Sequence, residues 1–220
     1  MIRVVVVDDE ALIRSGFELV LNTAEDIRVV AAVGGGQATA AVMEHSPDLV
    51  LLDVRMPGID GLTVLRRLTA LPVPPVVAML TAFDSGTHLA AALRSGASGF
   101  LLKDIDPVRL AAQVRSLVAG EVVLSAAATA AVVAGYLDHQ DCLHRRTDAS
   151  AGLSDRERDV LVLLAEGLSN AEIGRRLHLS AGTVKDHVST LLSRLGLVNR
   201  LQAALWAHRA GLLTHDPCSD

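Results

Sequence analysis

Residues 1–10 read MIRVVVVDDE, so four consecutive valines lead directly into three acidic residues. Similar apolar runs recur over the first 120 residues, with helical periodicity between them; the runs span 2–7, 27–33, 48–53, 75–80 and 99–102, and the helical segments span 10–24, 37–45, 60–70, 85–95 and 107–118. Strands that are apolar throughout are typical of a parallel sheet covered on both faces. We therefore expect a doubly wound α/β domain with a five-stranded parallel sheet over residues 1–121.

Polar residues stand at the ends of four of these predicted strands. Asp8 and Asp9 end the first strand, Asp53 ends the third, Thr81 follows the fourth and Lys103 follows the fifth. Ligands of open parallel sheets bind outside the carboxyl ends of the strands, so we expect these groups to converge. Converging carboxylates need positive charge, and Mg²⁺ prefers carboxylate oxygens. The alternative is that each acid only ends its strand in a solvated turn, but the full set at one edge favours a cation site.

Two glycine-containing loops invite a stronger interpretation than they support. Gly34–Gly36 resembles a phosphate-binding loop but lacks the GxxxxGK[ST] pattern. We interpret it as a flexible β/α loop that lies away from the acidic cluster. Met56-Pro57-Gly58 is interpreted as a turn without chemistry.

The bulk composition excludes several classes of protein. The formal net charge is −5, so the whole chain is not a general nucleic-acid binder. Cys142 and Cys218 have no metal-ligand spacing and are expected to be reduced thiols. No apolar run reaches the roughly 18–20 residues that a membrane span needs, and the N-terminus does not resemble a signal peptide. We expect a cytoplasmic protein without membrane contact.

The last third of the chain has a purely helical pattern. We expect a connecting helix and a polar linker over 122–151, then a four-helix domain over 152–214 and a tail at 215–220. The expected helices span 155–166, 170–177, 181–195 and 200–210, and Ser154/Glu157 and Ser169/Glu172 read as capping boxes at the start of the first two. Residues 151–214 hold eight basic and six acidic residues, a balance of +2, against ten and thirteen, or −3, in residues 1–120. The short second and third helices with a tight turn between them predict a helix-turn-helix DNA-binding domain.

Helical geometry separates two faces of the predicted third helix. A buried stripe is expected at Val184, Val188, Leu191 and Leu195, and an opposite face at Gly182, Asp186, Ser189 and Ser193, flanked by Lys185 and Thr190. His187, at the edge of the stripe, is interpreted as a packing or capping residue. Trp206 is expected in the core, whereas Leu201, Ala204 and Leu205 could serve either the core or a dimer contact.

The motifs of the first domain resemble those of a known family. VVDDE (6–10), LLDVRMPGIDGL (51–62), LTAFD (80–84) and GASGFLLKD (96–104) are similar, in order and spacing, to the receiver domain of two-component response regulators, which has a flavodoxin-like fold. The resemblance implies that Asp53 is the phosphoacceptor and that Asp8, Asp9, Asp53 and the backbone carbonyl of Arg55 hold Mg²⁺. It also implies phosphoryl and switch contacts at Thr81, Phe100 and Lys103, with an ordinary core position as the alternative for Phe100.

Residues 153–207 strongly resemble the LuxR-type DNA-binding domain, and the whole chain therefore resembles a NarL/FixJ-type response regulator. This implies a cognate sensor histidine kinase, double-stranded DNA with paired half-sites and a homodimer on DNA. The third helix would enter the major groove, where Lys can address guanine and Asp can accept from cytosine. The candidate DNA contacts are Thr183, Lys185, Asp186, Ser189, Arg194, Arg200, Arg175 and Arg176, each of the arginines having a solvated surface position as its alternative.

Two other functions compete with this interpretation. Clusters of Asp, Mg²⁺ and Lys at strand ends also occur in phosphatases and phosphotransferases, but no second acid for general acid–base turnover is evident here. A constitutive DNA-binding protein with a degenerate receiver is a second alternative, and the intact Asp53, Thr81 and Lys103 argue against it. The sequence leaves open the stimulus, the operator, activation against repression, and whether the receiver masks the recognition helix.

Overall fold

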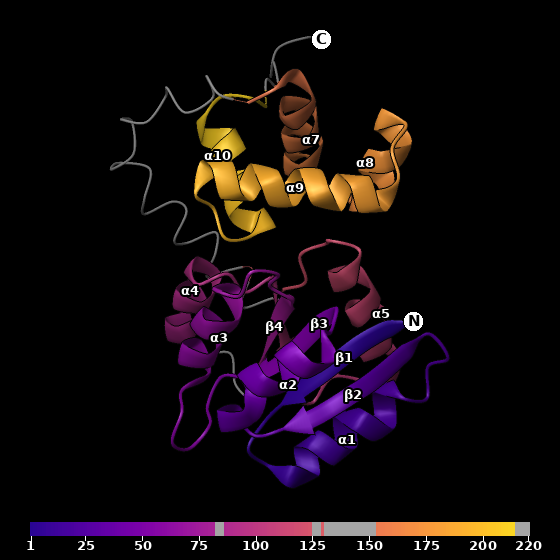
Figure 1. Ribbon diagram of the computed structural model, residues 1–220, viewed down its shortest axis with the longest axis vertical. Coiled ribbons are helices and arrows are strands. Elements are labelled where there is room, and N and C mark those ends of the chain that lie inside the picture. Colours follow the sequence, from indigo (N-terminus) through magenta and orange to yellow (C-terminus); the bar gives the residue numbers. More distant parts are fainter. Residues whose placement is uncertain (82–85, 125–128, 130–152, 214–220) are drawn as a thin grey trace. The chain divides into compact units, whose positions relative to one another are not determined.

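The computed structural model describes residues 1–81, 86–124, 129 and 153–213 (Figure 1). These residues fall into two compact units, one built on residues 1–118 and the other on the helices from residue 155 onward. The predicted connecting helix and linker at 122–151 and the tail at 215–220 lie almost wholly outside the described residues. Within the described part of the chain, no helix combines the length and the apolar character needed to cross a membrane.

The first unit is a five-stranded parallel sheet, as the sequence predicts. The strands lie in the order β2-β1-β3-β4-β5, and every neighbouring pair is parallel. Their bounds are β1 (Ile2–Val7), β2 (Ile27–Val33), β3 (Leu49–Asp53), β4 (Val76–Thr81) and β5 (Gly99–Leu102). The helices are α1 (Ala11–Leu21), α2 (Ala38–His45), α3 (Gly61–Thr69), α4 (Gly86–Arg94) and α5 (Pro107–Val118), and a 3₁₀ turn, η1 (Gly35–Gln37), precedes α2.

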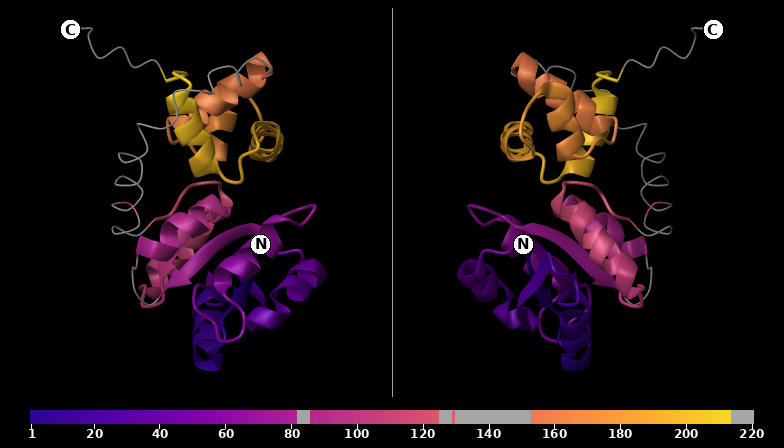
Figure 2. Two further views of the ribbon diagram at one scale, coloured as in Figure 1. Left: turned by 90° about the vertical axis from the view of Figure 1, so that its left-hand side faces the viewer. Right: turned by 90° about the vertical axis from the view of Figure 1, so that its right-hand side faces the viewer.

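Helices cover both faces of this sheet, which explains why its strands are apolar throughout. Figures 1 and 2 show α1 and α5 on one face and α2, α3 and α4 on the other. The side chains of Val4 to Val7 are fully buried, and Val4 and Val6 share a core cluster with residues of α1 and α5. The side chain of Asp106 accepts from the backbone N–H of Val108 and so caps the start of α5.

The strand register places the predicted polar residues side by side. Val7 of β1 pairs with Leu52 of β3, so Asp8 and Asp53 follow adjacent positions at the same edge. Thr81 of β4 pairs with Leu102 of β5, immediately before Lys103. The four strand ends therefore converge at the carboxyl edge, where open α/β sheets bind ligands.

The second unit contains four helices within its described residues. These are α7 (Asp155–Ala165), α8 (Asn170–Leu177), α9 (Ala181–Leu195) and α10 (Arg200–Arg209). Both predicted capping boxes are present, at Ser154/Glu157 and Ser169/Glu172, and the Ser180 hydroxyl caps α9 by accepting from the N–H of Thr183. Caps at the predicted positions explain why the helix bounds agree with the sequence to within one residue.

α9 crosses α7 at a steep angle (Figures 1 and 2), and one stripe of its side chains packs into the unit's core. Val184 and Leu191 are fully buried, with Val188 and Leu195 packed against the same cluster, as predicted. Trp206 of α10 is partly buried against this cluster, and His187 is half-buried. Gly196 ends α9 with a φ of +65°, a conformation that glycine adopts without steric cost.

Candidate functional site

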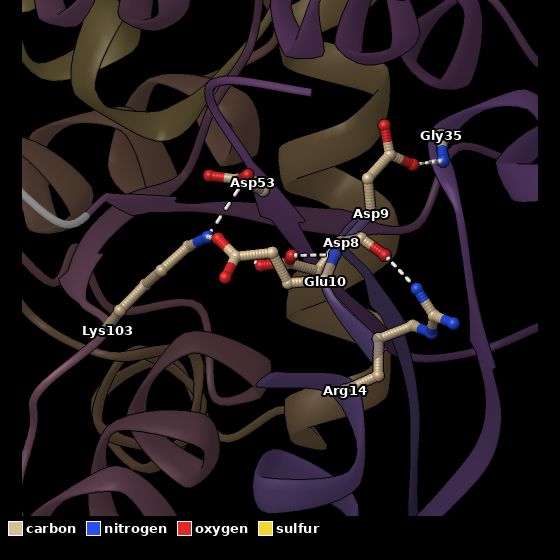
Figure 3. Close-up of polar contacts among 7 residues, drawn as sticks. All are labelled: Asp8, Asp9, Glu10, Arg14, Gly35, Asp53 and Lys103. Atoms are coloured by element: carbon tan, nitrogen blue, oxygen red, sulfur yellow. Dashed lines mark hydrogen bonds and ion pairs between the residues drawn. The ribbon is translucent and has the colours of Figure 1, made fainter. Parts of the chain in front are cut away.

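A single ammonium group lies between the carboxylates at the sheet edge (Figure 3). Lys103 Nζ is 2.7 Å from Asp8 Oδ2, 3.1 Å from Asp53 Oδ2 and 4.0 Å from Glu10 Oε1. Asp8 is 0% exposed and Asp53 is 4% exposed, so two carboxylates share one lysine almost out of contact with water. Burial makes both the attraction to Lys103 and the repulsion between the acids stronger than they would be at the surface.

Backbone hydrogen bonds fix the positions of these groups. The N–H of Asp8 donates to the carbonyl of Val33, and Asp8 Oδ1 accepts from the N–H of Glu10 at 2.8 Å. On the other side of the site, the N–H of Lys103 donates to the carbonyl of Thr81. Because each group is held by the sheet or by a turn directly after a strand, the site is built on rigid elements.

Two residues that the sequence analysis did not assign to the site also contact it. Glu10 reaches Lys103, and Arg14 of α1 donates through Nη1 to the carbonyl of Asp8 at 2.7 Å. Glu10 belongs to the quoted DDE motif, so its proximity could have been inferred. No periodic signal marks Arg14, since its role depends on how α1 packs beside β1.

The environment shifts the pKa of both Asp53 and Lys103. Burial raises the pKa of the Asp53 carboxyl, and the charge of Asp8 adds to the increase, although Lys103 works against it. For Lys103, burial disfavours the charged form, but hydrogen bonds to Asp8 and Asp53 outweigh burial and raise its pKa. Lys103 therefore stays charged, and the site holds more negative charge than this one ammonium can offset.

Asp9 lies apart from the ion-paired cluster, and its position shows that the expectation for the glycine loop after β2 was wrong. Its carboxylate points toward the loop after β2, and Oδ1 accepts from the N–H of Gly35 at 3.1 Å (Figure 3). The Gly34–Gly36 loop was expected to lie away from the acidic cluster, but it contacts one of the acids directly. β2 lies beside β1 with Val7 paired to Val33, so the sheet order brings the loop that follows Val33 against Asp9.

The donor set matches the chemistry of a hard divalent cation. Asp8, Asp9 and Asp53 offer carboxylate oxygens at one edge, which is what Mg²⁺ prefers. Among the described residues, however, no three acids, histidines or cysteines are already gathered around a common point, since Asp9 is turned toward Gly35. The residues fit Mg²⁺ by type, although the Asp9 carboxylate points toward Gly35 and away from Asp53 in this structure.

The remaining predicted receiver residues lie where the strand ends place them. Thr81 is the last residue of β4, and Phe100 is buried in β5 beside Met79 of β4. Arg55 is exposed, and its backbone works weakly against the rise in the pKa of the Asp53 carboxyl. Gly61 begins α3 so close to the Asp53 carbonyl that a Cβ at this position would overlap it. The loop after Asp53 therefore needs glycine at 61 so that the start of α3 can pack against the backbone of Asp53.

In the second unit, most of the predicted DNA contacts lie on exposed surface. Asp186 and Ser189 are exposed on the face of α9 opposite its buried stripe, and Lys185 is exposed on the flank of that face, with Thr183 at the start of the same helix. Arg175 and Arg176 are exposed near the end of α8. This face combines basic and hydroxyl side chains, which are the groups that contact phosphates and base edges.

Two other predicted DNA contacts have partners inside the second unit. Arg194 Nη1 is 2.8 Å from Oε2 of the buried Glu157, which links the end of α9 to the start of α7. Arg200 donates to the carbonyls of Leu164 and Leu168 and to the side chain of Asn170, which links α10 to the α7–α8 turn. The contact of Glu157 with Arg194, unlike its capping box, could not be predicted from the sequence.

Comparisons with known proteins agree with both halves of this description. The sequence-family model of the response regulator receiver domain matches residues 4–115. The family model of the luxR family of bacterial regulatory proteins matches residues 151–207. The nitrate/nitrite response regulator protein NarL of Escherichia coli (strain K12) is 35% identical over 207 residues, covering 94% of each chain. The DNA-binding transcriptional activator DevR/DosR of Mycobacterium tuberculosis is 37% identical over 211 residues, also covering 94% of each chain.

A solved structure spans both units as well. The crystal structure of the response regulator ChrA in a heme-sensing two-component system is 32% identical, covers 96% of this chain and 98% of that chain, and has a TM-score of 0.51. Family membership makes the chain a transcription regulator instead of an enzyme that turns over an external substrate. The chain belongs to the NarL/FixJ-type two-component response regulators, with a receiver domain and a LuxR-type helix-turn-helix domain.

Proposed function

We propose that Asp53 accepts a phosphoryl group from a partner sensor histidine kinase, and that this event controls DNA binding by α9. The observation that carries the proposal is the pairing of Asp53 Oδ2 with Lys103 Nζ at 3.1 Å, beside the buried Asp8. A carboxylate can attack phosphorus, forming an O–P bond while the bond to the kinase imidazole breaks. Lys103 neutralises charge on the transferred group.

Asp8, Asp9, Asp53 and the backbone carbonyl of Arg55 would hold Mg²⁺, which receiver domains typically use. The cation would supply further positive charge at the site. The excess of carboxylates over ammonium groups in this cluster supports that assignment.

The switch would run through Thr81 and Phe100. Phosphorylation adds about −1.5 to −2 charge and strong acceptor oxygens at Asp53, and the Thr81 hydroxyl would donate to them. Thr81 belongs to β4, which pairs with the strand of Phe100, β5. Movement of Thr81 would therefore change the packing around Phe100. Such local electrostatic events can bias a larger conformational equilibrium.

For DNA recognition, α9 would enter the major groove with Lys185, Asp186 and Ser189 toward base edges. Thr183, Arg175 and Arg176 would contact phosphates. Arg194 and Arg200 remain candidate phosphate contacts, but their bonds to Glu157 and to the α7–α8 turn give them a positioning role first. We propose that the protein binds paired half-sites as a homodimer, because symmetric half-sites match a protein with two-fold symmetry. We propose that it acts in the cytoplasm.

The test is intact mass after incubation with Mg²⁺ and acetyl phosphate, for the wild type and Asp53→Asn. We expect one phosphoryl group on the wild type and none on the variant. An unmodified wild type, or equal uptake by Asp53→Asn, would contradict the assignment. Selection of binding sites from random DNA by the phosphorylated wild type, repeated with Lys185→Ala, then tests the second half of the proposal.

A further inference from the structure

The loop after β2 holds the one acid of the β1 motif that does not contact Lys103. Asp9 Oδ1 accepts from the N–H of Gly35 at 3.1 Å, and Figure 3 shows the Asp9 carboxylate pointing toward Gly35 and away from Lys103. Asp8 and Asp53, by contrast, share Lys103. The three carboxylates are therefore divided between two different partners.

Close packing fixes the Gly35 amide in this position. A Cβ on Gly35 would lie 2.6 Å from Ile59 Cγ2 and 2.9 Å from Met56 Cε, so the residue is wedged against the loop that follows β3. A Cβ on Gly34 would lie 2.9 Å from Asp9 Oδ1 itself. Gly36 is different, since a Cβ there would have no neighbour within 4 Å. The first two glycines thus permit the contact with Asp9, and the third does not take part in it.

We propose that the Gly34–Gly35 segment retains the Asp9 side chain and competes with the divalent cation for it, so that this loop sets the cation affinity of the receiver. The inference rests on the proposed role of Asp9 as a cation ligand. In Figure 3 the Asp9 carboxylate points toward Gly35 and away from Asp53, so binding a cation shared with Asp53 requires the carboxylate to turn, and this turn breaks the hydrogen bond that Oδ1 accepts from Gly35. A hydrogen bond of ordinary net strength corresponds to roughly a three- to tenfold change in an equilibrium constant.

The chain offers a matched pair of single-methyl substitutions for the test. In Gly34→Ala, the added methyl group meets Asp9 Oδ1 and displaces the carboxylate from the Gly35 amide. Gly36→Ala adds the same methyl group to open space. Gly34 has φ −79° and ψ 165°, which alanine adopts readily, and Gly36 does not have a positive φ.

Binding of Mn²⁺ to the full-length proteins can be measured from the electron paramagnetic resonance signal of the free ion. We expect Gly34→Ala to bind Mn²⁺ about three- to tenfold more tightly than the wild type, and Gly36→Ala to stay within about twofold of it. An unchanged or weaker affinity in Gly34→Ala would overturn the proposal. Asp9→Ala distinguishes a failure of the loop proposal from a failure of the proposed cation site. If this variant binds Mn²⁺ as well as the wild type, Asp9 is not a ligand and the proposed cation site is itself wrong.

A second measurement uses the wild type, which avoids any folding defect of a variant. In protein labelled with ¹⁵N-glycine, the assigned Gly35 amide proton should shift upfield as Mg²⁺ saturates the site, because its hydrogen bond to the carboxylate is lost. The Gly36 amide, which is not bonded to Asp9, provides the internal reference. A Gly35 proton that keeps its position or moves downfield would show that Asp9 remains bound to the loop, and would overturn the proposal.

Discussion

The receiver and the helix-turn-helix domain both bury carboxylates, but with opposite effects on the charged form. In the receiver, burial beside Asp8 raises the pKa of Asp53. In the helix-turn-helix domain, hydrogen bonds from Ser154 lower the pKa of the buried Glu157, and hydrogen bonds from Ser169 likewise lower that of the exposed Glu172. The second domain provides hydrogen-bond donors for its acids within the fold. In the receiver, one ammonium faces two buried carboxylates, which leaves negative charge for the proposed cation to offset.

This difference separates a structural use of charge from a functional one. Glu157 closes a capping box and reaches Arg194 of α9, so its charge helps to hold α9 in place. Asp53 lies in an environment that disfavours its charged form, which suits its proposed role in binding a cation and accepting a phosphoryl group. Sites of this kind are typically placed at some cost in stability.

The largest expected effect follows from removing the shared ammonium of the receiver with Lys103→Met. This leaves Asp8 and Asp53 as unpaired buried charges, and breaking a buried pair from one side typically costs roughly 3–5 kcal/mol. Urea unfolding followed by far-UV circular dichroism should show this loss. The fluorescence of Trp206, the single tryptophan, reports the other domain and should keep its midpoint.

Arg109→Met is the control for Lys103→Met, because Arg109 is an exposed basic residue of α5. It should unfold as the wild type does. If Lys103→Met also left the receiver transition unchanged, the buried charges would not depend on Lys103, and the contrast between the two domains would fail.

A smaller effect is expected in the helix-turn-helix domain from Ser154→Ala. The substitution removes the side-chain acceptor of the capping box and one donor to Glu157, and losing such a cap costs about 1 kcal/mol. The urea midpoint from Trp206 fluorescence should decrease. Ser193→Ala, at an exposed position inside α9, should leave the midpoint unchanged or slightly higher, and equal losses in both variants would argue against a specific role for the cap.

The smallest effect is a difference in how the two domains respond to pH. Because the folded pKa values of Glu157 and Glu172 are lowered, their contribution is complete above the ordinary value of 4.5 and is lost as the pH falls through the folded values. The folded pKa of Asp53 is raised, so its unfavourable contribution at neutral pH is relieved as the pH falls through that value. Trp206 fluorescence and circular dichroism, recorded from pH 7 downward, should therefore diverge, and parallel curves would contradict this account.

Much of the fold follows from the sequence, because its signals are local. Apolar runs predicted the five strands, and the side-chain caps Ser154 and Ser169 marked helix starts that the structure confirms. The convergence of Asp8, Asp53, Thr81 and Lys103 also follows, since parallel strands end at a common edge.

The features that were missed depend on packing between distant segments. The contact between Gly35 and Asp9 needs the strand order, because β2 and β1 are neighbours only once the sheet has formed. Arg194 and Arg200 look like surface cations in the sequence, but their partners come from α7 and from the α7–α8 turn. The raised pKa of Asp53 likewise arises from burial, which periodicity alone does not measure.

Hydrogen exchange of full-length protein, compared between the wild type and Asp53→Asn without divalent cations at neutral pH, tests the central claim most directly. Exchange in peptides from β1 and β3 reports the local free energy of opening. If the Asp53 charge is unfavourable in the fold, Asp53→Asn should exchange more slowly there, whereas Glu157→Gln should exchange faster in α7 and α9. Faster exchange of β1 and β3 in Asp53→Asn would show that the buried charge stabilises the receiver, and would contradict the account.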